Sequence, residues 1–227
     1  KKVIIALVIV AVIVGCLNIT VISRKGVNYV VQTIEIPLYL KVLDFFDRHY
    51  NYKVLIKKIV GNAKTEEDRA KKIMEWTIAN IKENPSTLPI IDDHVWHIIV
   101  RGYGVDDQFQ DVFTTLCGYA GLDAFLDWVE PAGVSKKALS FVRLKGKWSV
   151  FDVYNGTYFV RKNDGEIADI ENLMSGNWRS VNTLNKKTPD YTKYIAAFKA
   201  VDYDHWFYKR AAIQSPIRRF IYWFKKE

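Results

Sequence analysis

The sequence predicts an α+β domain preceded by an apolar N-terminal helix. Residues 65–81 and 106–120 carry apolar side chains at helical spacing, and residues 138–160 alternate between apolar and polar side chains. Helices followed by antiparallel strands are typical of the α+β class. A third observation is the uninterrupted apolar run at 3–17. The chain has 227 residues, of which 49% are hydrophobic, so one sizeable core can form beside this run.

The N-terminal residues predict a membrane anchor. The apolar run continues as a mixed stretch to Ile22, which supplies the roughly 20 residues that a helix needs to cross a bilayer. A cleaved signal is the alternative, because residues 13–16 are similar to the lipobox of bacterial lipoproteins, in which the cysteine is lipidated. We expect contact with membrane lipid and a domain outside the cytoplasm, in a bacterial periplasm or at the cell surface. The anchor residues are Val3, Ile4, Leu7, Val14 and Cys16.

Charge and cysteine content exclude several other classes. The net charge is +8, but the sequence has no arginine-rich tract, zinc-finger spacing or aromatic nucleic-acid motif, so we expect no nucleic-acid partner. Two cysteines cannot build an internal disulfide framework when one lies in the apolar N-terminus. We expect no cofactor. A protein partner in or near the membrane remains the expectation.

Helical segments precede the central part of the chain. After Pro37, apolar residues at helical spacing predict one or two helices packed on the core, and Thr65 three residues before Asp68 predicts the start of another helix that ends by Asn84 and Pro85. The apolar positions after Pro37 are Leu40, Leu43, Phe46, Val54, Ile56 and Ile59.

The C-terminal third is predicted to be mostly helical. A turn and a short helix are expected at 164–177, a polar connection at 182–190, and a helix from about Asp190. A last helix begins at Pro216, and its basic and aromatic residues suit either a membrane interface or docking on the domain. The predicted divisions are an anchor or signal at 1–24, a helical lead-in at 25–64, a core at 65–181 and C-terminal helices at 182–227.

The stretch RGYGVDDQFQDVFTTLCGYAGLDAF, residues 101–125, predicts a glycine turn that opens into a helix. The helix begins near Asp106 and is stopped by Gly121. A cysteine in such a first turn would have a lowered pKa, because the helix dipole stabilises the thiolate. Downstream, the Lys145-Gly146 turn predicts a hairpin of two strands.

These segments resemble the core of transglutaminase-like domains, relatives of the papain-like cysteine proteases. Leu116-Cys117 and Gly121 are similar to the helix end of that family, and Trp148 and Asp152 to the strand that carries its aspartate. The resemblance covers residues 65–173. It implies a papain-like fold, with a catalytic cysteine at the helix start and a histidine and an aspartate on neighbouring strands.

The family's catalytic residues do not all carry over. Asp106 stands where the resemblance places the cysteine, Lys137 stands near the position of the histidine, and only Asp152 matches. The four histidines lie at positions 49, 94, 97 and 205, so none falls on the expected strand. Cysteine chemistry needs a thiolate and a base, whereas a carboxylate and an ammonium offer an ion pair. We therefore expect a catalytically inactive, membrane-anchored domain that acts as a binding or scaffolding module.

Two other functions remain open. The first is a hydrolase that uses Asp106 with Asp152, or a metal held by His94 and His97 with the aspartates at 92, 93, 106 and 107. The second is a structural subunit of a membrane complex. Cys117 is not a displaced nucleophile on this interpretation, because it lies on the apolar face of its helix and is expected to pack.

Overall fold

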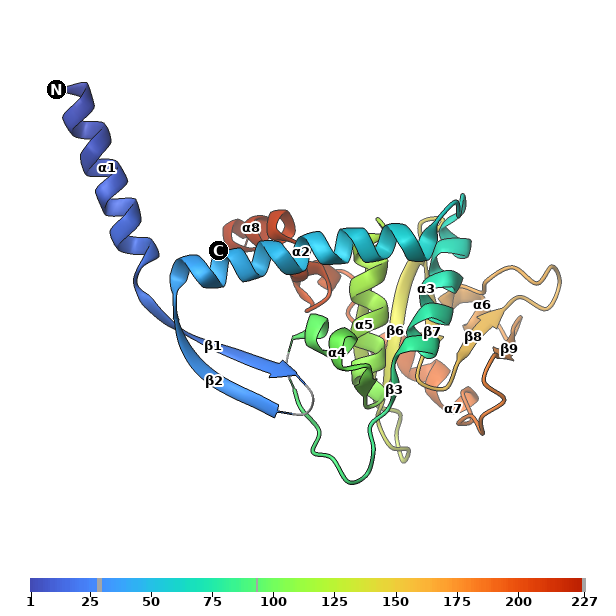
Figure 1. Ribbon diagram of the computed structural model, residues 1–227. Coiled ribbons are helices and arrows are strands. Elements are labelled where there is room, and N and C mark those ends of the chain that lie inside the picture. Colours follow the sequence, from blue (N-terminus) through green and yellow to red (C-terminus); the bar gives the residue numbers. More distant parts are fainter. Residues whose placement is uncertain (28–29, 93, 226–227) are drawn as a thin grey trace.

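A five-stranded antiparallel sheet lies at the centre of the domain (Figure 1). The structure is a computed structural model and describes residues 1–27, 30–92 and 94–225. Each strand pairs with the next along the chain, so the order in the sheet is the chain order. The strands are β5 (Ala124–Val129), β6 (Lys137–Leu144), β7 (Lys147–Asp152), β8 (Thr157–Val160) and β9 (Arg179–Asn182).

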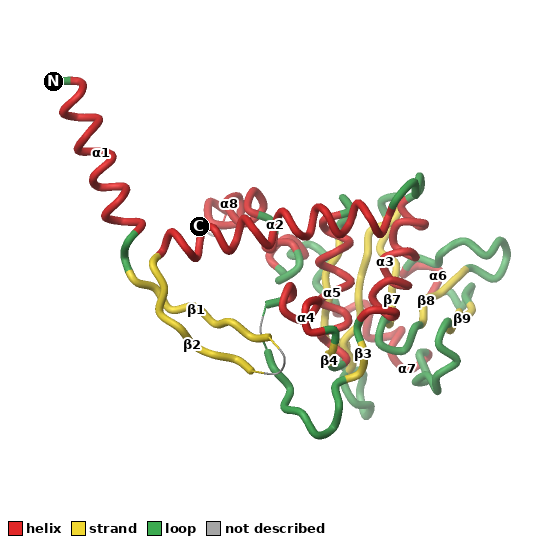
Figure 2. Tube along the Cα trace, in the orientation of Figure 1, coloured by secondary structure: helices red, strands yellow, loops and turns green. Residues whose placement is uncertain are grey.

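Helices cover both faces of this sheet (Figure 2). In β6, Val142 and Leu144 join a core on one face, whereas Leu139 and Phe141 join a second core on the other. Successive side chains of a strand point to opposite faces of the sheet, so both faces of the sheet are apolar here. Each face therefore needs other elements packed over it. The first core is covered by the second half of α2 (Leu38–Val60), α3 (Glu66–Asn80), α4 (Val95–Arg101) and α5 (Asp106–Tyr119), and the second by α6 (Ile170–Met174), α7 (Thr192–Ile195) and the 3-10 helix η1 (Ala196–Ala200).

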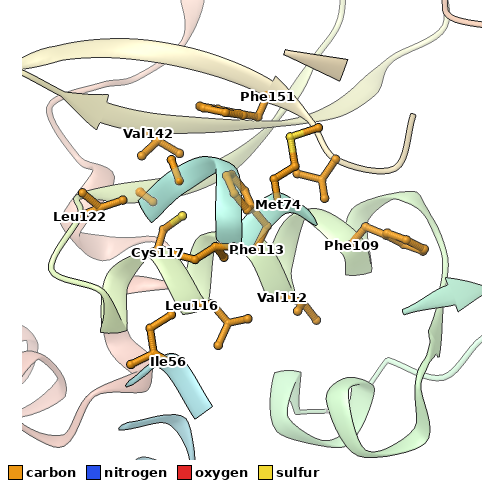
Figure 3. Packing of buried hydrophobic residues seen from close by; sticks show 14 of the residues in the cluster. Ile56, Met74, Phe109, Val112, Phe113, Leu116, Cys117, Leu122, Val142 and Phe151 are labelled. Atoms are coloured by element: carbon orange, nitrogen blue, oxygen red, sulfur yellow. The ribbon is translucent and has the colours of Figure 1, made fainter. Parts of the chain in front are cut away.

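Helix α5 lies inside the first core (Figure 3). Every residue from 108 to 117 is buried. The ring of Phe113 lies 5.2 Å from the ring of Phe151 on β7, and Cys117 packs in the same cluster. Each large apolar side chain buried here contributes about 1.5–3 kcal/mol. The position of α5 is therefore fixed from several sides, which also fixes its first turn.

Two features that short sequence patterns predict are confirmed. The Thr65 hydroxyl accepts a hydrogen bond of 3.0 Å from the Asp68 amide at the start of α3, as the capping pattern predicts. The helix ends at Asn80, before the expected Asn84, because β3 (Lys82–Glu83) leaves it to pair with β4 (Tyr103–Gly104). Between β6 and β7, Lys145 and Gly146 have φ of 50° and 81°, the left-handed pair that a two-residue hairpin turn requires.

The prediction of a membrane-crossing helix through Ile22 is wrong in length. Helix α1 (Lys2–Leu17) ends before that residue, and β1 (Thr20–Val27) pairs with β2 (Val30–Pro37) to form a hairpin. Isoleucine, threonine and valine at 19–22 suit a strand as well as a helix, so the apolar pattern does not separate the two. In the described part of the chain, no helix is long and apolar enough to cross a bilayer. The expected anchor residues all lie on α1 with exposed side chains: Val3, Ile4, Leu7, Val14 and Cys16.

The lead-in at 25–64 also differs from its prediction. It holds part of the hairpin besides one continuous helix, α2. In the second half of α2, Ile56 is buried and Ile59 packs partly buried against the core as expected, whereas Val54 is exposed and the prediction for it is wrong. Leu40, Leu43 and Phe46 in the first half are exposed, so the prediction that they pack on the core is wrong.

The C-terminal segment returns along the helical side of the molecule. It forms two 3-10 helices, η2 (Trp206–Tyr208) and η3 (Ala212–Gln214), and then α8 (Pro216–Lys225), which begins at the predicted proline. Arg218 and Arg219 contact the domain through the rings of Trp206 and Phe45. Four apolar side chains on α8 are exposed: Ile217, Phe220, Ile221 and Phe224.

Candidate functional site

The start of α5 places a carboxylate beside Lys137, at the start of the inner strand β6. Gly102 ends α4 with a φ of 72°, and the chain turns through β4 to begin α5 at Asp106. The Gln108 side chain accepts from the Val105 amide at 3.3 Å, which satisfies one of the free amides at the helix start. A carboxylate in this first turn is stabilised by the helix dipole.

The three residues singled out by the resemblance converge. The Lys137 ammonium at the start of β6 lies 3.0 Å from Oδ2 of Asp106 and 3.3 Å from Oδ2 of Asp152 at the end of β7. Asp152 is fully buried, and the side chains of Lys137 and Asp106 are 11% and 30% exposed. The cation therefore lies between two carboxylates, one deep in the protein and one reachable from solvent.

Gln110 joins the two carboxylates from one helical turn further along α5. Its amide nitrogen lies 3.4 Å from Asp106 Oδ1 and 3.5 Å from Asp152 Oδ1. Its carbonyl oxygen accepts from the Ser140 hydroxyl at 2.6 Å and from the Val153 amide at 3.3 Å. The spacing of four residues from Asp106 could have indicated the first contact, but nothing in the sequence indicates the others.

Asp152 has further donors. Asn155 donates to its Oδ2 through the side-chain amide at 2.8 Å, and the Tyr191 hydroxyl donates to the same oxygen at 2.7 Å. A buried carboxylate needs such donors, since its desolvation otherwise costs several kcal/mol. No sequence pattern indicates this contact of Tyr191, which lies in the segment before α7.

Burial and charge act on the cluster in opposite directions. Burial raises the pKa of Asp106, and the Lys137 charge opposes this only in part, while Asp152 adds to it. For Lys137, burial opposes the charged form, but Asp152 and Asp106 outweigh it and raise the pKa above its ordinary value. Lys137 is thus an ammonium at neutral pH, unable to accept a proton as a base. As the pH falls, Asp106 takes up its proton above the usual range of an aspartate.

The cysteines and histidines lie in other places. Cys117 is fully buried in the first core, where burial raises its pKa well above that of an ordinary thiol, as expected for a packing residue. His49 lies 2.9 Å from the Tyr119 hydroxyl, and His205 pairs with Asp202 at 2.8 Å. The site thus consists of two carboxylates and an ammonium, from Asp106, Asp152 and Lys137. Such a set can form ion pairs and can bind polar groups of a ligand.

The histidines and aspartates considered as metal ligands do not form a metal site among the described residues. The rings of His94 and His97 lie 6.1 Å apart at the start of α4, while Asp92 is paired with Arg210 at 3.3 Å and Asp93 lies outside the described residues. Among the residues that the structure describes, no group of three or more His, Cys, Asp and Glu side chains is placed to hold a metal ion.

Helix α5 packs on an antiparallel sheet, with charged residues at its start and on the neighbouring strands. Residues 53–153 match the model of the transglutaminase-like superfamily, a segment that runs from α2 to just past β7.

Comparison with solved structures finds three partial similarities, each with little shared sequence. A protein called a TGase is 14% identical, with a TM-score of 0.39, over 58% of this chain and 43% of its own. A proposed cysteine protease from Cytophaga hutchinsonii is 17% identical, with a TM-score of 0.39, over 59% and 46%. A proposed protease from Parabacteroides distasonis is 13% identical, with a TM-score of 0.39, over 58% and 35%. The chain thus spans less than half the length of each structure. No curated protein matches it.

Proposed function

We propose that this protein is a catalytically inactive transglutaminase-like domain that acts as a binding or scaffolding module. The observation that carries the proposal is the Lys137 ammonium held between Asp106 and Asp152 at 3.0 and 3.3 Å. A nucleophile with a base beside it is the arrangement that acyl transfer requires, and a salt-bridged carboxylate at the helix start cannot supply it. The ion pair stands where a nucleophile and its base would be needed for acyl transfer. It instead presents a fixed polar surface, which a ligand or partner can contact through Asp106.

A gain-of-function experiment tests this proposal. Asp106→Cys and Lys137→His are combined in a Cys16→Ser background, because Cys16 is exposed and would react, while Cys117 is fully buried. A thiol introduced at a helix start beside an imidazolium has a pKa below the ordinary value of about 8.5. The pH dependence of alkylation by iodoacetamide measures this pKa, and Ser175→Cys, exposed at the end of α6, is the matched control.

The parent protein is assayed in parallel for hydrolysis and transamidation of peptide amides. We expect no turnover by the parent and a thiol of lowered pKa in the double variant. Turnover by the parent that Asp106→Ala abolishes contradicts the proposal. It would favour the second candidate, a hydrolase based on carboxylates, for which the raised pKa of Asp106 is the supporting observation. Lys137 argues against that candidate, because its positive charge lies between the two carboxylates and weakens the repulsion that would push their pKa values apart.

Helix α1 supports a further part of the proposal, attachment to membrane lipid. The described side chains of α1 are apolar after Lys2 and none is buried against the domain. An apolar surface of this size is not stable in water and needs a lipid or protein contact. Flotation with phosphatidylcholine vesicles, before and after deletion of residues 1–18, tests the contact. Binding that survives the deletion would overturn it. We also propose an extracytoplasmic domain, which protease digestion of intact cells tests.

The structural-subunit alternative draws on a second exposed apolar surface. Four side chains recur at helical spacing along one face of α2 and are exposed: Tyr39, Leu43, Phe46 and Tyr50. A partner protein near the membrane would bind this face. Co-purification at fixed stoichiometry that Leu43→Glu abolishes supports the subunit, and a monodisperse free protein in its native membrane extract argues against it.

A further inference from the structure

A large cavity separates the N-terminal hairpin from the body of the domain. It has a volume of about 690 Å³ and lies among β1, the first half of α2, the residue before α4, η3 and α8. Figure 1 shows β1 below the first half of α2, and α8 beside α2. Sites for small molecules in proteins commonly have volumes of roughly 300–1,000 Å³. The cavity shares no lining residue with the Asp106 cluster.

Basic side chains dominate the charge of the cavity wall. Two acidic side chains, Asp44 and Asp92, stand among the lining residues, and they are paired with Arg48 at 2.7 Å and with Arg210 at 3.3 Å. Arg210 also pairs with Asp111 at 3.0 Å. Five basic residues line the same cavity: Arg24, Lys41, Arg48, Arg210 and Arg219. The described part of the wall therefore carries an excess of positive charge.

His94 lies in the cavity wall, and its pKa is lowered there. Burial lowers its pKa to about 3, and Arg48, His97, Arg210 and Arg219 add to the shift. The imidazole is therefore neutral at physiological pH. Its Nδ1 is buried and has no hydrogen-bond partner among the described residues.

The remaining wall holds two polar residues, Ser23 and Gln214, and four apolar ones. Leu38, Val42, Phe45 and Ile213 line the same cavity. Arg219 lies over the ring of Phe45 at 5.5 Å, so cationic and apolar surfaces meet at one point. A ligand that uses the whole cavity needs an anionic head and an apolar body.

We propose that this cavity binds an anionic amphiphile whose head is a phosphate group. Guanidinium groups bind phosphate through paired, charge-assisted hydrogen bonds, and the wall offers several of them beside aliphatic and aromatic side chains. Ser23 and Arg24, on the hairpin that directly follows α1, form one side of the cavity. If α1 contacts lipid as proposed above, a membrane phospholipid is one source of this ligand, and a free amphiphile is the other.

Calorimetry on the full chain tests the site with three probes: dihexanoyl phosphatidic acid below its micellar concentration, dihexanoyl phosphatidylcholine and inorganic phosphate. We expect phosphatidic acid to bind most tightly. Arg24→Gln with Arg219→Gln removes two exposed cations from the wall and should weaken this binding at least about tenfold. The matched control is Arg179→Gln with Lys199→Gln, two exposed cations on β9 and η1.

The outcomes separate the parts of the inference. Absence of phosphatidic acid binding, or equal weakening by both double variants, overturns the site. Inorganic phosphate that binds as tightly as phosphatidic acid overturns the amphiphile. Val42→Ser should weaken the amphiphile and leave inorganic phosphate unchanged. Co-sedimentation with vesicles of phosphatidylcholine, with and without phosphatidic acid, then identifies the source of the ligand. If the increase in binding caused by phosphatidic acid is lost in the Arg24 and Arg219 variant, the ligand is a bilayer lipid. If that increase is unchanged in the variant, the ligand is a free amphiphile. None of these results depends on whether the Asp106 cluster is catalytic.

Discussion

Replacing Lys137 by methionine should strongly destabilise the fold, because it leaves two carboxylates without their cation. Asp152 is fully buried and lies 3.3 Å from the ammonium. Removal of one partner from a buried ion pair costs about 3–5 kcal/mol. The Asp106 pair adds little to this figure, since its carboxylate is 30% exposed and water can replace the contact. In a domain of this size the loss lowers the melting temperature by roughly 6–20 °C.

Urea unfolding followed by circular dichroism measures this change at neutral pH. Lys136→Met is the matched control, because Lys136 is exposed and lies over the ring of Trp128, where its removal should cost less than about 1 kcal/mol. Adding Asp152→Asn to Lys137→Met should recover part of the loss, since the buried charge is then gone. A loss below about 1 kcal/mol for Lys137→Met, or strict additivity in the double variant, would refute the reasoning.

Two further predictions concern pH and backbone shape. Because the pKa of His94 is about 3 in the folded protein, the unfolded chain binds a proton there that the folded chain does not, so stability falls as the pH drops from 6.5 toward 3. His94→Gln should reduce the stability lost between pH 7 and pH 5 by about 2 kcal/mol in urea unfolding, and an unchanged pH dependence would contradict this. Gly156→Ala should cost about 2–3 kcal/mol, because φ is 64° and the new Cβ would lie 2.6 Å from Leu184 Cγ. Gly165→Ala, with φ of 74° and nothing within 4 Å, should cost only about 1 kcal/mol of backbone strain in thermal unfolding, and equal losses would count against the clash.

The sequence predicted the elements whose signals are local. The Thr65 cap, the Lys145-Gly146 turn and the start of α8 at Pro216 each depend on a few neighbouring residues, and the structure has all three. The β1–β2 hairpin was missed because β-branched residues after α1 continue the apolar run, and an apolar run alone does not separate helix from strand.

The candidate site was predictable only in part. Asp106, Lys137 and Asp152 were selected through a family resemblance, and the structure brings them together. The hydrogen bonds that hold the cluster come from residues with no such signal. Gln110 reaches Ser140 across the helix–sheet interface, and Tyr191 reaches Asp152 from the C-terminal segment. Contacts of this kind depend on how distant segments pack, which a single sequence does not encode in any local pattern.

The Tyr191 hydrogen bond also bears on where the chain can be cut. The family match ends at residue 153, yet the buried carboxylate one position earlier accepts a hydrogen bond of 2.7 Å from Tyr191. A fragment trimmed to the matched segment would lose that donor along with β8 and β9. During synthesis, Asp152 leaves the ribosome well before its partner, so the cluster closes late and through a contact of long sequence separation, which slows folding. The boundaries of the folding unit therefore extend beyond the region of family similarity.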